Sequence, residues 1–132
     1  MYTDHSTTEI DTLLAKSEAA FYQYKNLSLK ERAHFMRSIA AEIEDLGEDL
    51  ITAAQKETHL SKKRLIAERK RTIFQLNSYA DAAEQGNWLE ARIDLGDADK
   101  TPSKPDLRKM LVPLGPVVVF GASNFPFAYS TA

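Results

Sequence analysis

Residues 111–126 have the sequence LVPLGPVVVFGASNFP, which predicts a strand, a turn of small residues and the start of a helix. The segment Val117–Phe120 lacks polar alternation, so we expect a strand that is covered on both faces. Ligands of α/β proteins bind where such strands end, which makes the turn from Gly121 to Asn124 the candidate site. Pro126 suits the first turn of the following helix, where its missing N–H costs nothing.

The residues of this turn allow two interpretations each. Asn124 is either a functional side-chain amide or simply the N-cap of the helix that follows. The segment Gly121-Ala122-Ser123 lets a ligand approach the backbone closely, yet it suits a plain strand-to-helix turn equally well. It is not a glycine-rich dinucleotide fingerprint.

Patterns of apolar residues divide the chain into three parts. Residues 1–87 are predicted to be helical, residues 88–112 to form a two-stranded antiparallel pair, and residues 113–132 to begin a Rossmann-like cofactor domain. The predicted fold class is therefore α+β, as a portion of a larger α/β fold. A parallel strand needs neighbours and a crossover helix, so we expect either that the chain is a fragment or that this segment docks in an unusual place.

Start and stop signals delimit the helices of the first part. Thr8 is the expected N-cap of the first helix, whose aromatic residues are expected in the core, and Ser28 to Glu31 is a capping box. Gly47 is expected to break the second helix, and Gly86 to end the last one in the left-handed conformation. The inner face of that last helix is predicted to comprise Leu65, Ile66, Thr72, Ile73, Leu76, Tyr79, Ala80 and Ala83.

The outer face of the last helix is basic, at residues 62–64 and 69–71. A solvated helix face is the simpler interpretation, and phosphate binding is the alternative. Beyond this helix, residues 89–95 alternate between apolar and polar, which predicts a half-buried strand with one wet face. Residues 107–112 are predicted to form its antiparallel partner.

The composition of the 132 residues limits the function classes. Seventeen basic and 19 acidic residues give a net charge of -2, which offers no electrostatic case for nucleic acid or an anionic membrane. The chain has no cysteine and therefore no cysteine nucleophile, and its three scattered histidines predict no metal site. No signal peptide is expected, so the predicted location is cytoplasmic.

Several motifs together resemble the aldehyde dehydrogenase superfamily. Residues 113–126 are similar to its strand and active-site asparagine motif. The form Gly-Ala-Ser-Asn-Phe-Pro resembles bacterial 2,5-dioxopentanoate (α-ketoglutarate semialdehyde) dehydrogenases and NADP-dependent long-chain aldehyde dehydrogenases. Upstream, the resemblance includes Glu57-Thr58, Arg64-Leu65, Glu68-Arg69, the segment from Arg71-Thr72 to Gln75-Leu76, and Pro105 to Met110.

This resemblance implies roles for the turn. Asn124 would contribute its side-chain amide to the oxyanion hole, and Phe120, Gly121, Ala122 and Ser123 would lie along NADP or NAD. The parent enzyme would be a homo-oligomer that oxidises an aldehyde through a cysteine nucleophile. Because that cysteine is absent here, we expect this polypeptide alone to be inactive and to bind no cofactor tightly. The alternative is a non-catalytic helical interaction module or a truncated remnant.

Overall fold

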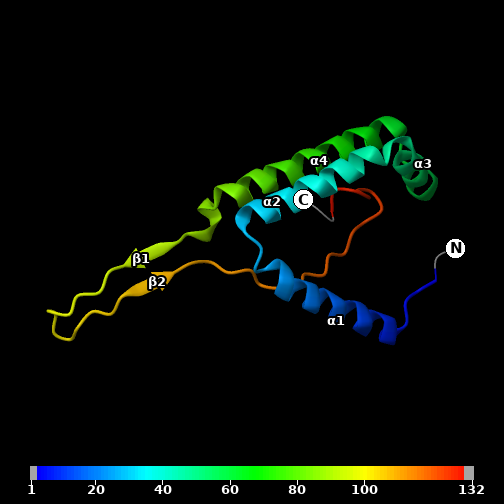
Figure 1. Cartoon of the computed structure of the whole chain (residues 1–132). Helices are drawn as coiled ribbons and strands as arrows, with labels where there is room; N and C mark the ends of the chain where they lie inside the picture. The colour runs from blue at the N-terminus through cyan, green and yellow to red at the C-terminus, as the bar shows by residue number, and fades with distance from the viewer. Residues whose placement is uncertain (1–2, 130–132) are drawn as a thin grey trace.

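The computed structural model describes residues 3–129, most of which are helical (Figure 1). Its elements are α1 (Thr7–Tyr24), α2 (Leu29–Asp45), α3 (Gly47–Thr58), α4 (Lys62–Gln85), the 3-10 helix η1 (Asn87–Leu89), β1 (Arg92–Asp94) and β2 (Leu107–Lys109). Helices α2 and α4 lie side by side in opposite directions, and α3 connects them at one end. The strands extend away from the other end as an antiparallel pair. The predicted helical region and antiparallel pair are thus confirmed.

Capping boxes start the first two helices. As predicted, the Ser28 hydroxyl accepts the Glu31 N–H at 3.2 Å, and the Glu31 carboxylate accepts the Ser28 N–H at 2.7 Å. The predicted cap of α1 at Thr8 is wrong, because Ser6 caps this helix and the Glu9 carboxylate completes the box. The reason is local: Ser6 has a glutamate three residues later, whereas Thr8 is followed at that spacing by the shorter aspartate.

The capping box makes the stability of α2 depend on pH. Hydrogen bonds from the Ser28 side chain, and then from its backbone N–H, hold the pKa of the Glu31 carboxyl below its ordinary value of 4.5. A lowered folded-state pKa stabilises the fold above the unfolded pKa, and this contribution is lost as the pH falls through the folded value. In urea unfolding between about pH 6 and about pH 3, Glu31→Gln should therefore lose less stability than the wild type. The control is Glu44→Gln, on the same helix but outside the box. Its free energy of unfolding should fall with pH as steeply as that of the wild type, and an equally steep fall for both variants would contradict the prediction.

Two glycines set the ends of the paired helices, as predicted. Gly47 has a φ of 53° and begins α3 directly after the end of α2. Gly86 has a φ of 73° and donates its N–H to the carbonyl of Ala82 at 3.3 Å, which ends α4. A side chain at this position would meet Leu29 Cδ1 at 2.8 Å, so the chain turns here with the start of α2 against it.

The core lies along the α2–α4 contact and continues to α3. Its fully enclosed centre is formed by Ile51 of α3 and Leu65 of α4, and Ala54 completes the cluster. Between α2 and α4, small side chains such as Ala40 allow the helices to approach closely. The buried apolar residues are Ala33, Ala40, Ile51, Ala54, Leu65, Leu76, Ala80 and Ala128.

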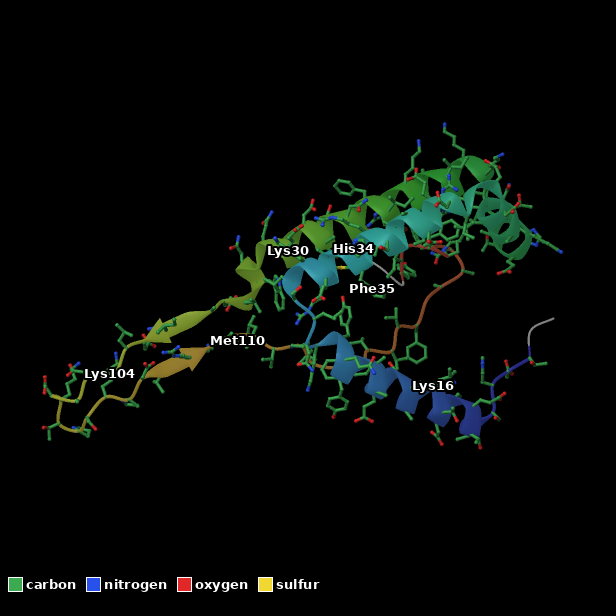
Figure 2. All side chains as sticks on the ribbon, viewed as in Figure 1. Lys16, Lys30, His34, Phe35, Lys104 and Met110 are labelled. Carbon is green, nitrogen blue, oxygen red and sulfur yellow. The ribbon has the colours of Figure 1, made fainter. Side chains whose placement is uncertain are left out.

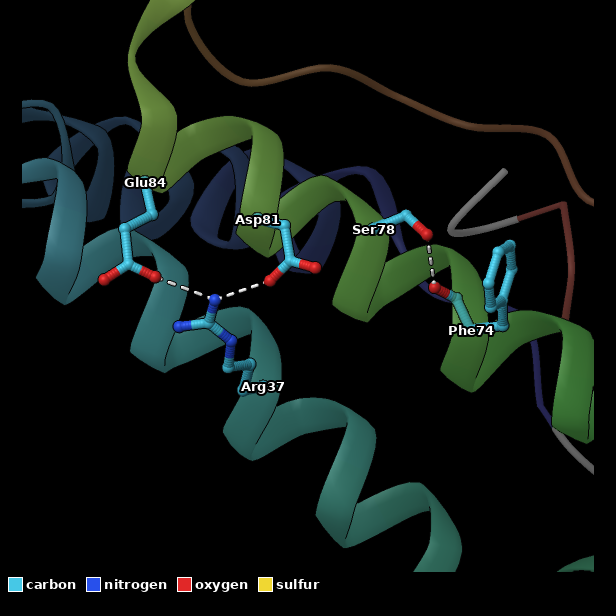
Figure 3. A network of polar contacts seen from close by, with 5 residues as sticks. All are labelled: Arg37, Phe74, Ser78, Asp81 and Glu84. Atoms are coloured by element: carbon cyan, nitrogen blue, oxygen red, sulfur yellow. Dashed lines mark hydrogen bonds and ion pairs between the residues drawn. The ribbon is translucent and has the colours of Figure 1, made fainter.

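An ion-pair cluster joins α2 to the end of α4 at the surface (Figure 3). Arg37 Nη2 donates to Asp81 Oδ1 at 2.6 Å and to Glu84 Oε2 at 2.8 Å. These bonds, with that to Asp81 foremost, raise the pKa of the Arg37 guanidinium. Exposed ion pairs contribute little energy individually. One guanidinium thus bridges two carboxylates that lie about one turn apart on α4, which links the two helices at the surface.

Helix α1 buries none of its residues, contrary to the prediction that its aromatic side chains belong to the core. Its C-terminal end contacts α2 through Tyr24, whose ring centroid is 5.6 Å from that of Phe35, and Phe35 lies on the side of α2 that faces α1 (Figure 2). Along the rest of α1, Ile10, Leu13 and Leu14 are about half exposed. Amphipathic spacing identifies the apolar face of a helix but not whether another element covers it.

The hairpin is shorter and more exposed than predicted. Three residues of each strand pair, with Ile93 opposite Arg108, and an isolated bridge joins Asp97 to Lys104 near the tip (Figure 2). The expected half-buried strand over residues 89–95 is wrong, because Ile93 is 61% exposed and the stretch begins as η1. In the part of the chain that the structure describes, no helix or further sheet covers either face of this strand pair, so its apolar side chains remain exposed.

The expected buried strand at residues 117–120 is also wrong. This segment forms no regular strand, and its valines and Phe120 are exposed. Within residues 3–129 no parallel neighbour pairs with it, so its backbone and side chains lack the partners that a covered strand requires. The predicted helix start at Pro126 is likewise a run of turns over residues 123–129.

Candidate functional site

The five predicted site residues form one exposed turn. Phe120, Gly121, Ala122, Ser123 and Asn124 follow one another on the segment that returns toward α2 and α4 (Figure 1). The turn is closed by a hydrogen bond from the N–H of the next residue to the carbonyl of Ala122, at 3.1 Å. All five residues are exposed, and the backbone of the turn is held by a contact from α4.

The first contact that fixes the turn comes from α4. Arg64 Nη2 donates to the backbone carbonyl of Asn124 at 2.6 Å. The same guanidinium lies over the ring of Phe125, 5.0 Å from its centroid, and that ring packs against Tyr129. Arg64 was expected to belong to a solvated basic face, with phosphate binding as the alternative. The structure instead gives this arginine a backbone partner 60 positions away.

The second contact is a buried glutamate that the sequence analysis missed. Glu68 is 6% exposed, and its Oε1 accepts the backbone N–H groups of Phe127 at 2.8 Å and Ala128 at 3.0 Å. A signal was present, because Glu68 falls at helical spacing between Leu65 and Thr72 on the predicted inner face. A charged residue on an apolar face has to be paired inside the protein. Tyr79, assigned to that face, is half exposed instead.

Apolar packing holds the same segment on the core. Phe127 packs against the cluster formed by Ile51, Ala54 and Leu65, and Ala128 is 2% exposed. The segment that follows Asn124 is therefore a docked part of the helical core. The site residue itself is at the edge of this docked part, with its side chain exposed.

The turn at residues 120–124 is exposed and contains no charged residue. A side chain added at Gly121 would meet nothing within 4 Å, so the backbone there is open to a ligand on that side. The neighbouring Ala122 and Ser123 are also small and exposed. A dinucleotide could lie along this backbone, and the groups that bind its phosphates would have to come from other segments.

The remaining polar features lie elsewhere. A hollow of about 460 Å³ between the end of α1 and residues 110–114 is lined by Lys25, Arg32 and Trp88, and the predicted site residues lie outside it. Within residues 3–129, no three histidine or acidic side chains are grouped so that they could hold a metal ion. None of the helices described there has the length and apolar character needed to cross a membrane.

Comparison with known proteins agrees with the motif. The model of the aldehyde dehydrogenase family matches residues 2–132. The chain is 48% identical over 114 residues to alpha-ketoglutaric semialdehyde dehydrogenase 2 of Azospirillum brasilense, an alignment that covers 86% of this chain and 22% of that protein. It is 38% identical over 133 residues to alpha-ketoglutaric semialdehyde dehydrogenase of Acinetobacter baylyi, covering 100% of this chain and 25% of that protein.

The chain thus spans about a quarter of the length of the curated relatives that it matches. The family match includes the helices, the hairpin and the docked turn, so it does not depend on the terminal motif alone. The protein belongs to the aldehyde dehydrogenase family.

Proposed function

We propose that these residues form the first part of an NAD(P)-dependent aldehyde dehydrogenase and supply its oxyanion-stabilising amide. The observation that carries the proposal is the turn itself. Arg64 holds the backbone at Asn124 and Glu68 holds the backbone just after it, while Asn124 itself is exposed. A fixed backbone with a free amide is the arrangement that an oxyanion hole requires, because donors must be in place before charge develops.

The reaction proceeds in three steps with balanced charges. A cysteine thiolate, supplied from outside these 132 residues, adds to the aldehyde carbon, and the carbonyl oxygen becomes the anion of a thiohemiacetal. Loss of hydride leaves a thioester, which water hydrolyses to the carboxylic acid and the free thiol. The Asn124 amide N–H donates to the carbonyl oxygen as its negative charge develops. NAD(P)⁺, when bound, accepts the hydride, and residues 120–123 would lie along it.

The substrate class is proposed from the relatives. Both are named as alpha-ketoglutaric semialdehyde dehydrogenases, so we assign this chain to an enzyme that oxidises α-ketoglutarate semialdehyde. The exposed hairpin and the uncovered apolar face of α1 suit contacts with further protein, either the rest of the same chain or a second copy in a homo-oligomer. Residues 113–132 would then begin its cofactor-binding domain.

Reduction of NAD⁺ and NADP⁺ tests this function. The complete enzyme that carries these residues should reduce one of them in the presence of α-ketoglutarate semialdehyde. It should do so much more slowly with pentanal, which has the same carbon number without the carboxylate. The 132-residue polypeptide alone should reduce neither, because it has no cysteine. Turnover by this polypeptide, freed of any longer enzyme, would overturn the thiolate mechanism, and a preference for pentanal would overturn the substrate.

A further inference from the structure

The amides of Phe127 and Ala128 have an unusual partner. At the starts of α1, α2 and α4, an opening N–H is accepted by the serine just before the helix, Ser6, Ser28 and Ser61, whereas α3 begins without a side-chain cap. After Pro126, the N–H groups of the next two residues are accepted by a carboxylate from another helix, that of Glu68 on α4. In the turns of residues 123–129, these two amides are therefore held by a side chain that is distant in the sequence.

The local cap would have been Asn124. Asparagine is among the strongest N-cap residues, and it lies at the right distance before Pro126 to accept an opening N–H. In that role its side chain would fold back onto the backbone. Within residues 3–129, however, the hydrogen bonding of Asn124 uses its backbone carbonyl, which accepts from Arg64, and not its side chain. The carboxylate of Glu68 accepts the N–H of Phe127, which an asparagine cap at position 124 would otherwise accept.

Glu68 is well placed for this task. It lies one helical turn after Arg64 and three residues after the fully buried Leu65, so one stretch of α4 contacts the chain at Asn124 and again just after it. Arg64 holds the carbonyl at position 124, and Glu68 holds the amides at positions 127 and 128. A carboxylate that accepts two backbone N–H groups forms charge-assisted bonds, which are stronger than those of a neutral amide.

We propose that Glu68 is a positioning residue that caps the segment after Asn124 and so keeps the Asn124 amide free for the oxyanion. This inference rests on the proposed function. It assigns to Glu68 no contact with substrate or cofactor. Its effect on the reaction passes entirely through the orientation of one side chain.

A double-mutant cycle in the complete enzyme tests this assignment, because two residues that act through one another give non-additive effects. The variants are Glu68→Ala, Asn124→Ala and the double variant, with Glu68→Gln as the conservative change. Glu84→Gln is the matched control, since it removes a carboxylate from the same helix and leaves Arg37 its bond to Asp81. The measurements are kcat and KM, the thermal unfolding midpoint, and hydrogen exchange of residues 125–129.

Displacing the Asn124 amide should weaken the stabilisation of the transition state and leave substrate binding nearly unchanged. We expect Glu68→Ala to lower kcat and kcat/KM together by about 10- to 100-fold, as a misplacement of about 1 Å does, with KM nearly unchanged. Glu68→Gln keeps an acceptor oxygen, so its kcat and kcat/KM should fall less than those of Glu68→Ala. The kcat/KM of the double variant should equal that of Asn124→Ala within about twofold. Exchange of residues 125–129 should accelerate in Glu68→Ala, and Glu84→Gln should resemble the wild type.

Each other outcome overturns a definite claim. If Asn124→Ala loses activity while Glu68→Ala and Glu68→Gln keep it, the positioning role is wrong and the proposed function stands. If the fold-losses of kcat/KM in the two single variants multiply in the double variant, Glu68 acts independently of Asn124. The positioning role is then again wrong. If Asn124→Ala is fully active, the proposed function fails and this inference fails with it. If Glu68→Ala does not fold, the Glu68→Gln cycle decides between these outcomes by the same criteria.

Discussion

Replacing Asn124 with alanine should lower kcat/KM of the complete enzyme by about 10²- to 10³-fold, the loss measured when one oxyanion donor is removed from a comparable site. The amide is exposed at the edge of a fixed turn, so its removal leaves the Arg64 and Glu68 contacts with the backbone intact. The loss should therefore appear in kcat with little change in KM or in the unfolding midpoint. Steady-state kinetics together with thermal unfolding measure both quantities.

Two further variants sharpen this test. Asn124→Asp has the same shape but replaces the donor by a negative charge, so it should be at least as impaired as Asn124→Ala. Asn87→Ala removes an exposed asparagine of η1, away from the turn, and should keep full activity. If Asn124→Asp were as active as the wild type, the amide could not be an oxyanion donor, and the turn would then have a structural role only.

Replacing Leu65 with alanine should lower the free energy of unfolding by about 2–5 kcal/mol, the usual cost of emptying a fully buried leucine site. Leu65 is 0% exposed and lies at the centre of the cluster with Ile51 and Ala54. Small domains have only about 5–15 kcal/mol of total stability. The change should therefore move the urea midpoint strongly at an unchanged m-value, as measured by circular dichroism.

Phe74→Ala is the control for Leu65. Phe74 lies on the same helix but is 70% exposed, and its substitution should change stability by no more than about 0.5 kcal/mol. Equal small effects for the two variants would show that the α3–α4 cluster does not carry the fold. Because Phe127 packs on the same cluster, Leu65→Ala should also loosen the segment after the site.

Features that depend on neighbouring residues were predictable from the sequence. The capping box at Ser28, the break at Gly47 and the left-handed end at Gly86 each follow from a few adjacent residues, and the structure confirms all three. The antiparallel pairing of the two strands was also correct, although both are shorter than predicted. Local chemistry determines such features whatever surrounds them.

Features that depend on distant residues were not predictable in the same way. The valine-rich segment 117–120 has the sequence of a covered strand, but such a strand forms only where neighbouring strands accept its hydrogen bonds. The apolar face of α1 was identified, whereas its lack of cover was not. The exposed turn with Asn124 was located from its motif. Its anchor at Glu68 was missed, because the partner amides are 59 and 60 positions away.

This separation along the chain has a consequence for the order of folding. The ion pairs between α2 and α4 join residues 44 and 47 positions apart, fewer than the 59 and 60 positions between Glu68 and its two amides, so we expect the helices to pair first. Synthesis proceeds from the N-terminus at about 5–20 residues per second, so the helices leave the ribosome seconds before Phe127 does. The carboxylate of Glu68 is then already held on a formed helix when its two amides arrive. We therefore expect the segment after Asn124 to dock onto helices that have formed before it.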